Sequence, residues 1–182
     1  FAWAEFAGSP CLEKQIVRMT DQRAPSNMTT QMPTSALYCD VLVVGSGAGG
    51  LACAVTAAHY GLDVIVVEKE DVIGGTSAWS GGWLWVPRNP LAQRAGIVEP
   101  RETPKHYLQS ELGNRASDPR IDIFLDNAPE MVHFFERNSA VAFIPGNAIP
   151  DFHTTPGHAL GGRSVCAAQY DGRELGDWIY KM

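Results

Sequence analysis

The chain has 182 residues, of which 45% are hydrophobic and 19% are charged, the balance of a globular protein with room for a sizeable core. Its 14 basic and 20 acidic side chains give a formal net charge of −6. This charge argues against nucleic acid or an anionic membrane surface as a partner, because both attract basic faces. No apolar run approaches the length that would cross a membrane.

The four cysteines, Cys11, Cys39, Cys53 and Cys166, have neither metal-binding nor CxxC spacing. Free thiols in a reducing compartment are therefore expected, which favours the cytoplasm, and no metal site is expected. The amino end carries Glu5 and no basic start, so it matches a signal peptide poorly.

The two ends of the chain differ from its middle. Residues 1–38 include the polar stretch "MTDQRAPSNMTTQMPTS", which predicts a disordered tail. The other end, "GRELGDWIYKM", stops within a pattern typical of a helix start. We therefore expect residues 1–38 to be a tail and the chain to be a fragment of a longer protein.

Residues 40–68 have the pattern of a β-strand, a helix and a second β-strand. Residues 40–44 are mostly β-branched, which predicts a parallel strand buried on both faces. Residues 45–50 fit GxGxxG, and the Ala-rich segment that follows predicts a helix that ends at Gly61. "LDVIVVE" then predicts a second buried strand that closes with Glu68.

Each part of this pattern has a physical role in binding a dinucleotide. Gly45 permits a tight turn, Gly47 lets the backbone approach a pyrophosphate, and Gly50 lets helix and strand pack closely. The helix N-terminus offers free N–H groups to phosphates, and Glu68 can accept hydrogen bonds from a ribose. The full context favours a dinucleotide site over a purely structural turn.

Two further glycine clusters follow Glu68 within the next 14 residues, at positions unsuited to the interior of a helix or strand. They suit backbone N–H groups that meet a ligand, and they favour FAD over NAD because an NAD site does not need them. Their residues are Gly74, Gly75, Thr76 and Ser77, and then Ser80, Gly81 and Gly82.

Residues 40–82, continuing into "WLWVPRNPLAQRAGI", resemble the FAD-dependent family of fumarate reductase and succinate dehydrogenase flavoprotein subunits. The segment "GGTSAWSGGWLWVPRNP" is most similar to the branch of 3-ketosteroid Δ1-dehydrogenases. The resemblance extends through "RIDIFLDNAPEMVHFFE" to "PDFHTTPGHALGGRSVCAAQYDGRELG" and so covers about Cys39 to the end. It implies an α/β fold, with a partial Rossmann-like FAD-binding domain followed by helices and loops. Residues 39–182 would be the N-terminal part of that FAD-binding domain in a fragment of such an enzyme, with the substrate domain largely absent.

The resemblance also implies a role for each matching position. The pyrophosphate of FAD would bind at Gly45, Ser46, Gly47, Ala48, Gly49 and Gly50. Glu68 would bind the adenosine ribose, and Lys69 would lie beside the adenine end. The phosphates and ribityl chain would contact Gly75, Thr76 and Ser77, next to Gly74. Ser80, Gly81 and Gly82 would run along the isoalloxazine ring.

The rest of the chain reads as helices and loops. Thr103 is expected to cap a helix with Pro104 at its first position and Gly113 as its stop. Residues 117–119, Ser-Asp-Pro, again combine capping residues with a proline and predict a second helix start. Pro129 is expected to break the following segment into two helices. Residues 140–152 predict a short strand that runs into a proline-punctuated loop.

Several side chains are candidates for contact with a substrate. Trp79, Trp83 and Trp85 could line an apolar site or pack in the core, and Trp83 is the one we assign to substrate. The loop residues His153, His158 and Arg163 could belong to a site or be solvated.

Phe152 stands where the ketosteroid dehydrogenases have an active-site tyrosine. A phenyl ring cannot relay a proton, so either another group takes this role or the substrate differs. Phe152 remains a candidate substrate contact, and no catalytic residue is assigned.

These observations predict an FAD-dependent dehydrogenase that transfers a hydride from a carbon next to a carbonyl-activated position to flavin N5. The expected substrate is apolar, with steroids favoured, and an external electron acceptor would complete the cycle. Two alternatives remain: reduction of an unsaturated acid, as in fumarate reductases, and a non-catalytic truncated FAD-binding fragment. The 182-residue chain alone is expected to be inactive.

Overall fold

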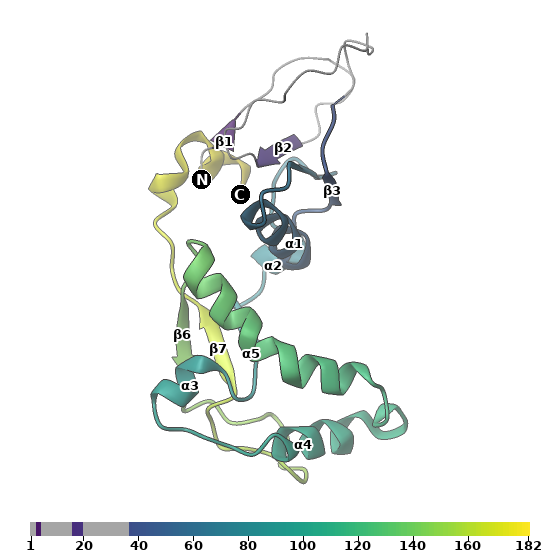
Figure 1. Cartoon of the computed structure of the whole chain (residues 1–182). Helices are drawn as coiled ribbons and strands as arrows, with labels where there is room; N and C mark the ends of the chain where they lie inside the picture. The colour runs from purple at the N-terminus through teal and green to yellow at the C-terminus, as the bar shows by residue number, and fades with distance from the viewer. Residues whose placement is uncertain (1–2, 5–15, 20–36) are drawn as a thin grey trace. The chain divides into compact units, whose positions relative to one another are not determined.

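The computed structural model describes residues 3–4, 16–19 and 37–182. It divides into two compact units (Figure 1). The first unit comprises Phe1–Ser80 and Asp171–Met182, and the second comprises Gly81–Tyr170. Within the described residues, no helix is long and apolar enough to cross a membrane.

The first unit contains the predicted βαβ arrangement. Its elements are β1 (Trp3–Ala4), β2 (Ile16–Met19), β3 (Val41–Val44), α1 (Ala48–His59), β4 (Val64–Val67), α2 (Gly75–Ala78) and the 3-10 segment η2 (Gly172–Lys181). The strand order in its sheet is β1-β2-β4-β3, and β3 pairs with β4 in parallel. α1 ends one residue before Tyr60, and Gly61 follows with a φ of 83°, the left-handed conformation that commonly ends helices.

The core of the first unit lies between its sheet and α1. Val64 and Val66 of β4 are buried together with Val43 of β3 and Ala54 of α1, and Trp178 of η2 packs against them. The small side chain of Ala54 allows α1 to approach the sheet closely. This packing holds the turn between β3 and α1 in place.

The prediction that β3 is buried on both faces is wrong. Val43 is buried, but Leu42 is 59% exposed and Val44 is 80% exposed. The reason is that side chains alternate along a strand: Val43 points toward α1, whereas Leu42 and Val44 point away from it. β3 is also the last strand of the described sheet. The run of β-branched residues therefore forms a strand without complete burial.

The expected disordered tail differs from the structure at two short segments. Trp3–Ala4 and Ile16–Met19 form β1 and β2, and β2 pairs antiparallel with β4. The backbone of the "IVRM" segment forms the hydrogen bonds of an antiparallel ladder with the edge of β4 that does not face β3. The remainder of residues 1–36 lies outside the described residues.

The second unit contains helices and a small sheet. Its elements are β5 (Trp83–Trp85), α3 (Pro90–Arg94), α4 (Glu102–Leu112), the 3-10 turn η1 (Gly113–Arg115), α5 (Arg120–Asn138), β6 (Phe143–Gly146) and β7 (Ser164–Ala167). β7 lies between β5 and β6 and is antiparallel to both. The sequence predicted β6 but only helices and loops elsewhere, so β5 and β7 correct that prediction.

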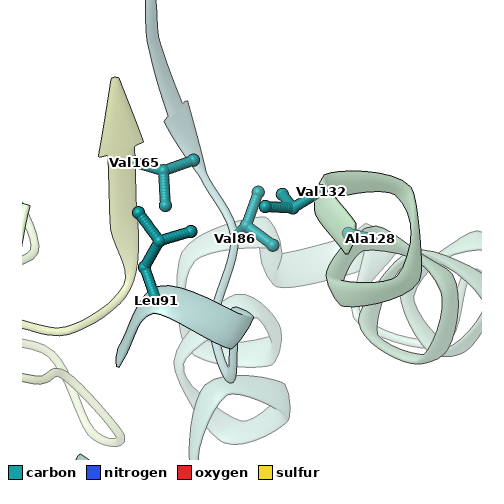
Figure 2. Close-up of a cluster of buried hydrophobic side chains, with 5 residues drawn as sticks. All are labelled: Val86, Leu91, Ala128, Val132 and Val165. Carbon is teal, nitrogen blue, oxygen red and sulfur yellow. The ribbon is translucent and has the colours of Figure 1, made fainter. Parts of the chain in front are cut away.

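Figure 2 shows the hydrophobic cluster that joins this sheet to its helices. Its buried members come from β7, α3, α5 and the segment after β5, and they are Val86, Leu91, Ala128, Val132 and Val165. Burying such side chains contributes about 1.5–3 kcal/mol for each Val or Leu. This cluster is the main apolar core of the second unit.

α5 is one continuous helix of 19 residues, so the predicted break at Pro129 is wrong. Proline has no N–H to donate to the carbonyl group four residues earlier, which belongs to Leu125. Arg88 supplies the missing donor, because its Nη2 lies 2.5 Å from the Leu125 oxygen. A side chain from outside the helix thus replaces the lost backbone hydrogen bond.

α4 begins at Glu102, so Thr103 is not its N-cap. The helix starts two residues earlier than predicted, and the N–H of Thr103 donates to the carbonyl of Pro100 at 3.1 Å. Pro104 falls in the first turn, where a missing N–H costs nothing. The predicted stop at Gly113 is confirmed, with a φ of 53°.

Candidate functional site

The turn between β3 and α1 is built around two glycines with different constraints. Gly45 has a φ of 97°, a conformation that side chains rarely adopt. A Cβ atom on Gly50 would overlap the carbonyl oxygen of Gly45. The tight turn and the close helix–strand packing predicted for these two residues are therefore both present.

Gly47 is under no such internal constraint. It caps α1 with a φ of −66° and a ψ of 173°, which any residue can adopt. A Cβ atom there would find its nearest neighbour, Ser77 Oγ, at 3.7 Å, an ordinary contact. The space in front of Gly47 is thus available for a ligand that must approach the backbone closely.

The N-terminus of α1 opens onto this space. In any α-helix the first four N–H groups have no intrahelical acceptor, and the end carries a partial positive charge. The N–H of Ala48 donates to Ser77 Oγ at 3.0 Å, while Gly49 has nothing within 4 Å of the position that a Cβ would take. The geometry suits a diphosphate.

Glu68 lies at the end of β4, beside this turn. Its Oε2 accepts hydrogen bonds from the N–H and the hydroxyl of Ser46 at 2.8 and 2.6 Å. Its Oε1 accepts from the N–H groups of Lys69 and Glu70 at 2.8 and 3.1 Å. The bonds from Ser46, followed by those from Glu70 and Lys69, lower the pKa of Glu68 from 4.5 to about 2.

The segment after Glu68 returns to the same turn. Gly74 has a φ of 110° and caps α2, a four-residue helix that includes Gly75, Thr76 and Ser77. The expectation that this cluster avoids helix is therefore wrong, although the positive φ of 53° at Gly75 still requires glycine. A Cβ on Gly75 would lie 3.7 Å from the Cα of Gly47, so the two glycine clusters adjoin.

Lys69 and Ser80 lie at the margins of this arrangement. The Lys69 side chain is exposed and pairs with Glu70 at 3.1 Å. The hydroxyl of Ser80 donates to the carbonyl of Ser77 at 2.8 Å. The structure thus brings together the predicted residues of the first unit, namely residues 45–50, Glu68 and residues 74–77.

Gly81, Gly82 and Trp83 belong to the second unit, next to β7. Gly82 has a φ of 72°, and its carbonyl accepts from the N–H of Ala167 at 3.0 Å. The carbonyl of Gly81 accepts a weak hydrogen bond from Cys166 Sγ at 3.4 Å. Trp83 is half-exposed at the start of β5.

Trp85 and Arg163 are part of the second unit's interior. Trp85 Nε1 donates to Asp151 Oδ1 at 2.7 Å, and its ring lies near those of Tyr107 and Phe124. Of the two alternatives for Trp85, lining an apolar site or packing in the core, the structure supports packing.

Arg163 is only 1% exposed and pairs with two carboxylates. Its Nη1 lies 2.6 Å from Asp151, and its Nη2 lies 2.7 Å from Glu99. A buried guanidinium between two acids is satisfied, so Arg163 serves the fold of the loop that carries it.

The other loop candidates are near the surface. His153 Nδ1 lies 2.5 Å from Glu111, and His158 Nδ1 lies 3.1 Å from the Thr155 carbonyl. Phe152 is 96% exposed, and Trp79, in the first unit, is 92% exposed.

Sequence reasoning treated Ser46 and Glu68 as separate ligand contacts and missed the link between them. Ser46 is buried, and its hydroxyl also accepts from the N–H of Gly74 at 2.9 Å. The sequence places a serine next to the first glycine of GxGxxG and an acid after the second strand, but nothing in this spacing shows that the two side chains meet. Among the described residues, no group of three or more His, Cys, Asp or Glu could hold a metal ion.

Comparison with known proteins adds three findings. Residues 40–181 match a family model described as FAD binding domain. The chain is 44% identical over 149 residues to the 4-oxocyclohex-2-ene-1-carboxylate 5-dehydrogenase of Sinomonas cyclohexanicum, covering 81% of this chain and 25% of that protein. It is 41% identical over 139 residues to a 3-oxosteroid 1-dehydrogenase of Rhodococcus opacus, covering 76% and 27%.

A solved structure is also similar. It is the 3-ketosteroid delta1-dehydrogenase of Sterolibacterium denitrificans in complex with 1,4-androstadiene-3,17-dione, with a TM-score of 0.70 and 37% identity. The match covers 79% of this chain and 26% of that one. The chain thus spans about a quarter of the length of the relatives it matches.

Proposed function

Because the chain belongs to the family of FAD-binding domains, we propose that it forms the N-terminal, FAD-binding part of a dehydrogenase that acts on a carbon–carbon bond next to a ring ketone. The observation that carries the proposal is the β3–α1 turn. Gly45 and Gly50 are required there by the protein's own geometry, whereas Gly47 leaves open space at the N-terminus of α1. That combination suits a diphosphate.

The residues that would hold FAD divide into two groups. The first group would bind the ADP and ribityl parts of FAD: residues 45–50 the pyrophosphate, Glu68 and Lys69 the adenosine end, and residues 74–77 the phosphates and ribityl chain. Ser80, Gly81 and Gly82 would meet the isoalloxazine ring. The positive φ of Gly74, Gly75 and Gly82 supports these assignments, because such turns let a ligand approach the backbone without a side chain in the way.

The relatives suggest the substrate class. The names of both curated relatives include an oxo-substituted ring, one a steroid and the other a cyclohexene carboxylate. We therefore expect an apolar cyclic ketone and favour a steroid, with Trp83 and Phe152 as candidate contacts because both rings are available on the surface of the second unit. FAD would supply a hydride acceptor at its N5 atom, and an external electron acceptor would reoxidise it.

The chain's own contribution would be binding and orientation. The N–H groups at the start of α1 would neutralise part of the diphosphate charge, and the ionised Glu68 would accept hydrogen bonds from ribose hydroxyl groups. Phe152 can exclude water but cannot carry a proton, so the proton must be taken by another group. A cytoplasmic location is proposed from the cysteine spacing alone.

The test is a dye-linked dehydrogenase assay on the protein expressed from its complete gene. The assay compares three substrates: a 3-ketosteroid, a monocyclic oxocyclohexene carboxylate and fumarate. Fumarate is tested with reduced dye. We expect oxidation of the ketosteroid and its loss in Gly47→Val, in which a side chain blocks the diphosphate. Oxidation of the monocyclic ketone alone would replace the steroid by a monocyclic ketone as the assigned substrate. Turnover of fumarate alone would favour the reductase alternative, and flavin binding without any turnover would favour a non-catalytic protein.

A further inference from the structure

Ser46 occupies the second position of the GxGxxG turn, but its side chain is directed into the protein. The residue is buried, and its hydroxyl donates to Glu68 Oε2 at 2.6 Å while it accepts from the N–H of Gly74 at 2.9 Å. Its own N–H donates to the same Oε2 at 2.8 Å. One side chain therefore joins three segments: the β3–α1 turn, the end of β4 and the turn before α2.

The two oxygens of the Glu68 carboxylate have different surroundings. Both bonds from Ser46 to Oε2 are buried, whereas Oε1 accepts partly buried bonds from the N–H groups of Lys69 and Glu70. A carboxylate has about four acceptor positions, so all of them are used within the protein. A ligand that bonds to this carboxylate must therefore displace one of these donors, and the partly buried bonds to Oε1 are the ones less shielded by the protein.

We propose that Ser46 is a positioning residue: it fixes Oε2 of Glu68 and the Gly74 turn together, so that Oε1 is the atom that accepts hydrogen bonds from the ribose hydroxyl groups of an adenine nucleotide. This inference rests on the proposed function. It assigns to the Ser46 side chain a role that differs from direct contact with the cofactor. Each ribose hydroxyl that donates to Oε1 takes the place of one of its two backbone partners.

The charge state of Glu68 agrees with this role. The hydrogen bond from the Ser46 hydroxyl is the largest cause of its lowered pKa. The carboxylate is ionised at neutral pH and acts only as an acceptor. Without that hydroxyl, Oε2 would keep only the N–H of Ser46 as a donor, and the carboxylate could turn toward solvent. The N–H of Gly74 would also lose its acceptor, which loosens the turn that adjoins Gly47.

The experiment measures how strongly the complete protein distinguishes ADP from 2′,3′-dideoxy-ADP, each competing with FAD. Because a hydrogen bond to a charged group contributes more than a neutral one, we expect ADP to bind about tenfold or more tightly in the unsubstituted protein. Ser46→Ala and Glu68→Gln should each remove most of this preference. The double variant should lose no more than either single variant, because Ser46 acts through Glu68.

Thr56→Ala is the matched control, because it removes a hydroxyl near the other end of α1. It should keep the full preference for ADP. A Ser46→Ala protein that also keeps the full preference would overturn the inference while leaving the proposed function intact. An unsubstituted protein that binds no FAD would overturn the proposed function and this inference together.

Amide exchange keeps the inference testable if Ser46→Ala does not fold. In the unsubstituted protein, the N–H of Gly74 should exchange slowly both with and without ADP, because Ser46 accepts its hydrogen bond in both states. The N–H of Glu70, a partner of Oε1, should change its exchange rate when ADP binds. Rapid exchange at Gly74, or a change there instead of at Glu70, would contradict the assignment.

Discussion

The glycines of the β3–α1 turn meet different physical needs. Gly45 provides a backbone conformation with positive φ, Gly50 avoids overlap with a carbonyl group, and Gly47 leaves room for a ligand. Gly49 meets none of these needs, since nothing lies within 4 Å of the position of its Cβ. Substitutions can therefore separate the glycines that serve the fold from the one that serves binding.

We expect Gly50→Ala to lower the free energy of unfolding by about 1–3 kcal/mol, because the new methyl group meets backbone atoms that cannot move aside easily. Gly49→Ala is the matched control. It should be neutral or stabilising by up to about 1 kcal/mol, because alanine favours a helix over glycine. Urea denaturation of both variants measures the difference. Equal stability of the two variants would contradict the packing described for Gly50.

Glu68 gives the protein a specific dependence on pH. Its pKa is lowered to about 2 in the folded state from an ordinary value of 4.5, so its stabilising effect is fully present above pH 4.5. The effect is lost as the pH falls through the folded pKa. We expect Glu68→Gln to be less stable than the unsubstituted protein at neutral pH, with the difference shrinking between about pH 4.5 and 2. Denaturation curves that stay separated by a constant amount would show that the carboxylate is not held in this way.

At the scale of elements, α5 depends on a residue far from it in the sequence. Arg88 donates to the carbonyl of Leu125, which Pro129 leaves without its helical partner. Arg88 also has a φ of 60°, a strained conformation for a residue other than glycine. The contact with α5 gives a physical reason for that strain to persist.

We expect Arg88→Met to lower the free energy of unfolding by about 1–3 kcal/mol, because a carbonyl group loses its donor. In a Pro129→Ala background the same substitution should cost less, because the new backbone N–H can bond to Leu125. Thermal or urea unfolding of the four proteins forms a double-mutant cycle. Additive effects would mean that Arg88 does not compensate for the proline.

These elements also show what the sequence could and could not predict. The pattern of β3, α1 and β4 is local, so valine runs and a glycine turn were enough to predict these elements and the turn between them. The continuity of α5 and the strands β5 and β7 depend on partners distant in sequence. For the same reason the link from Ser46 to Glu68 and Gly74 appeared only in the structure, because three separate segments supply it.

At the scale of the whole molecule, the face of β3 that points away from α1 is an exposed apolar surface of the first unit. Leu42 and Val44 are exposed on it, at the edge of the described sheet. Exposed apolar edges of this kind favour self-association. In a protein with the length of the relatives, other segments could cover this face.

We therefore expect residues 39–182, expressed by themselves, to associate and to retain FAD poorly. Val44→Lys should shift the elution volume on gel filtration toward that of a monomer, because the charge opposes edge-to-edge pairing. Val43→Lys is the contrasting variant, since Val43 is buried and its substitution should unfold the unit instead. A monomeric, yellow and catalytically competent product from the unsubstituted segment would contradict this expectation.

The central claim is that the β3–α1 turn binds FAD, and flavin binding by the complete protein tests it most directly. The purified protein should show flavin absorbance or take up added FAD, and it should prefer FAD to NADH. Gly47→Val should lose FAD binding while its melting temperature stays close to that of the unsubstituted protein, because the space at Gly47 is open. A colourless protein that takes up no FAD but binds NADH, or a Gly47→Val variant that keeps its flavin, would contradict the account.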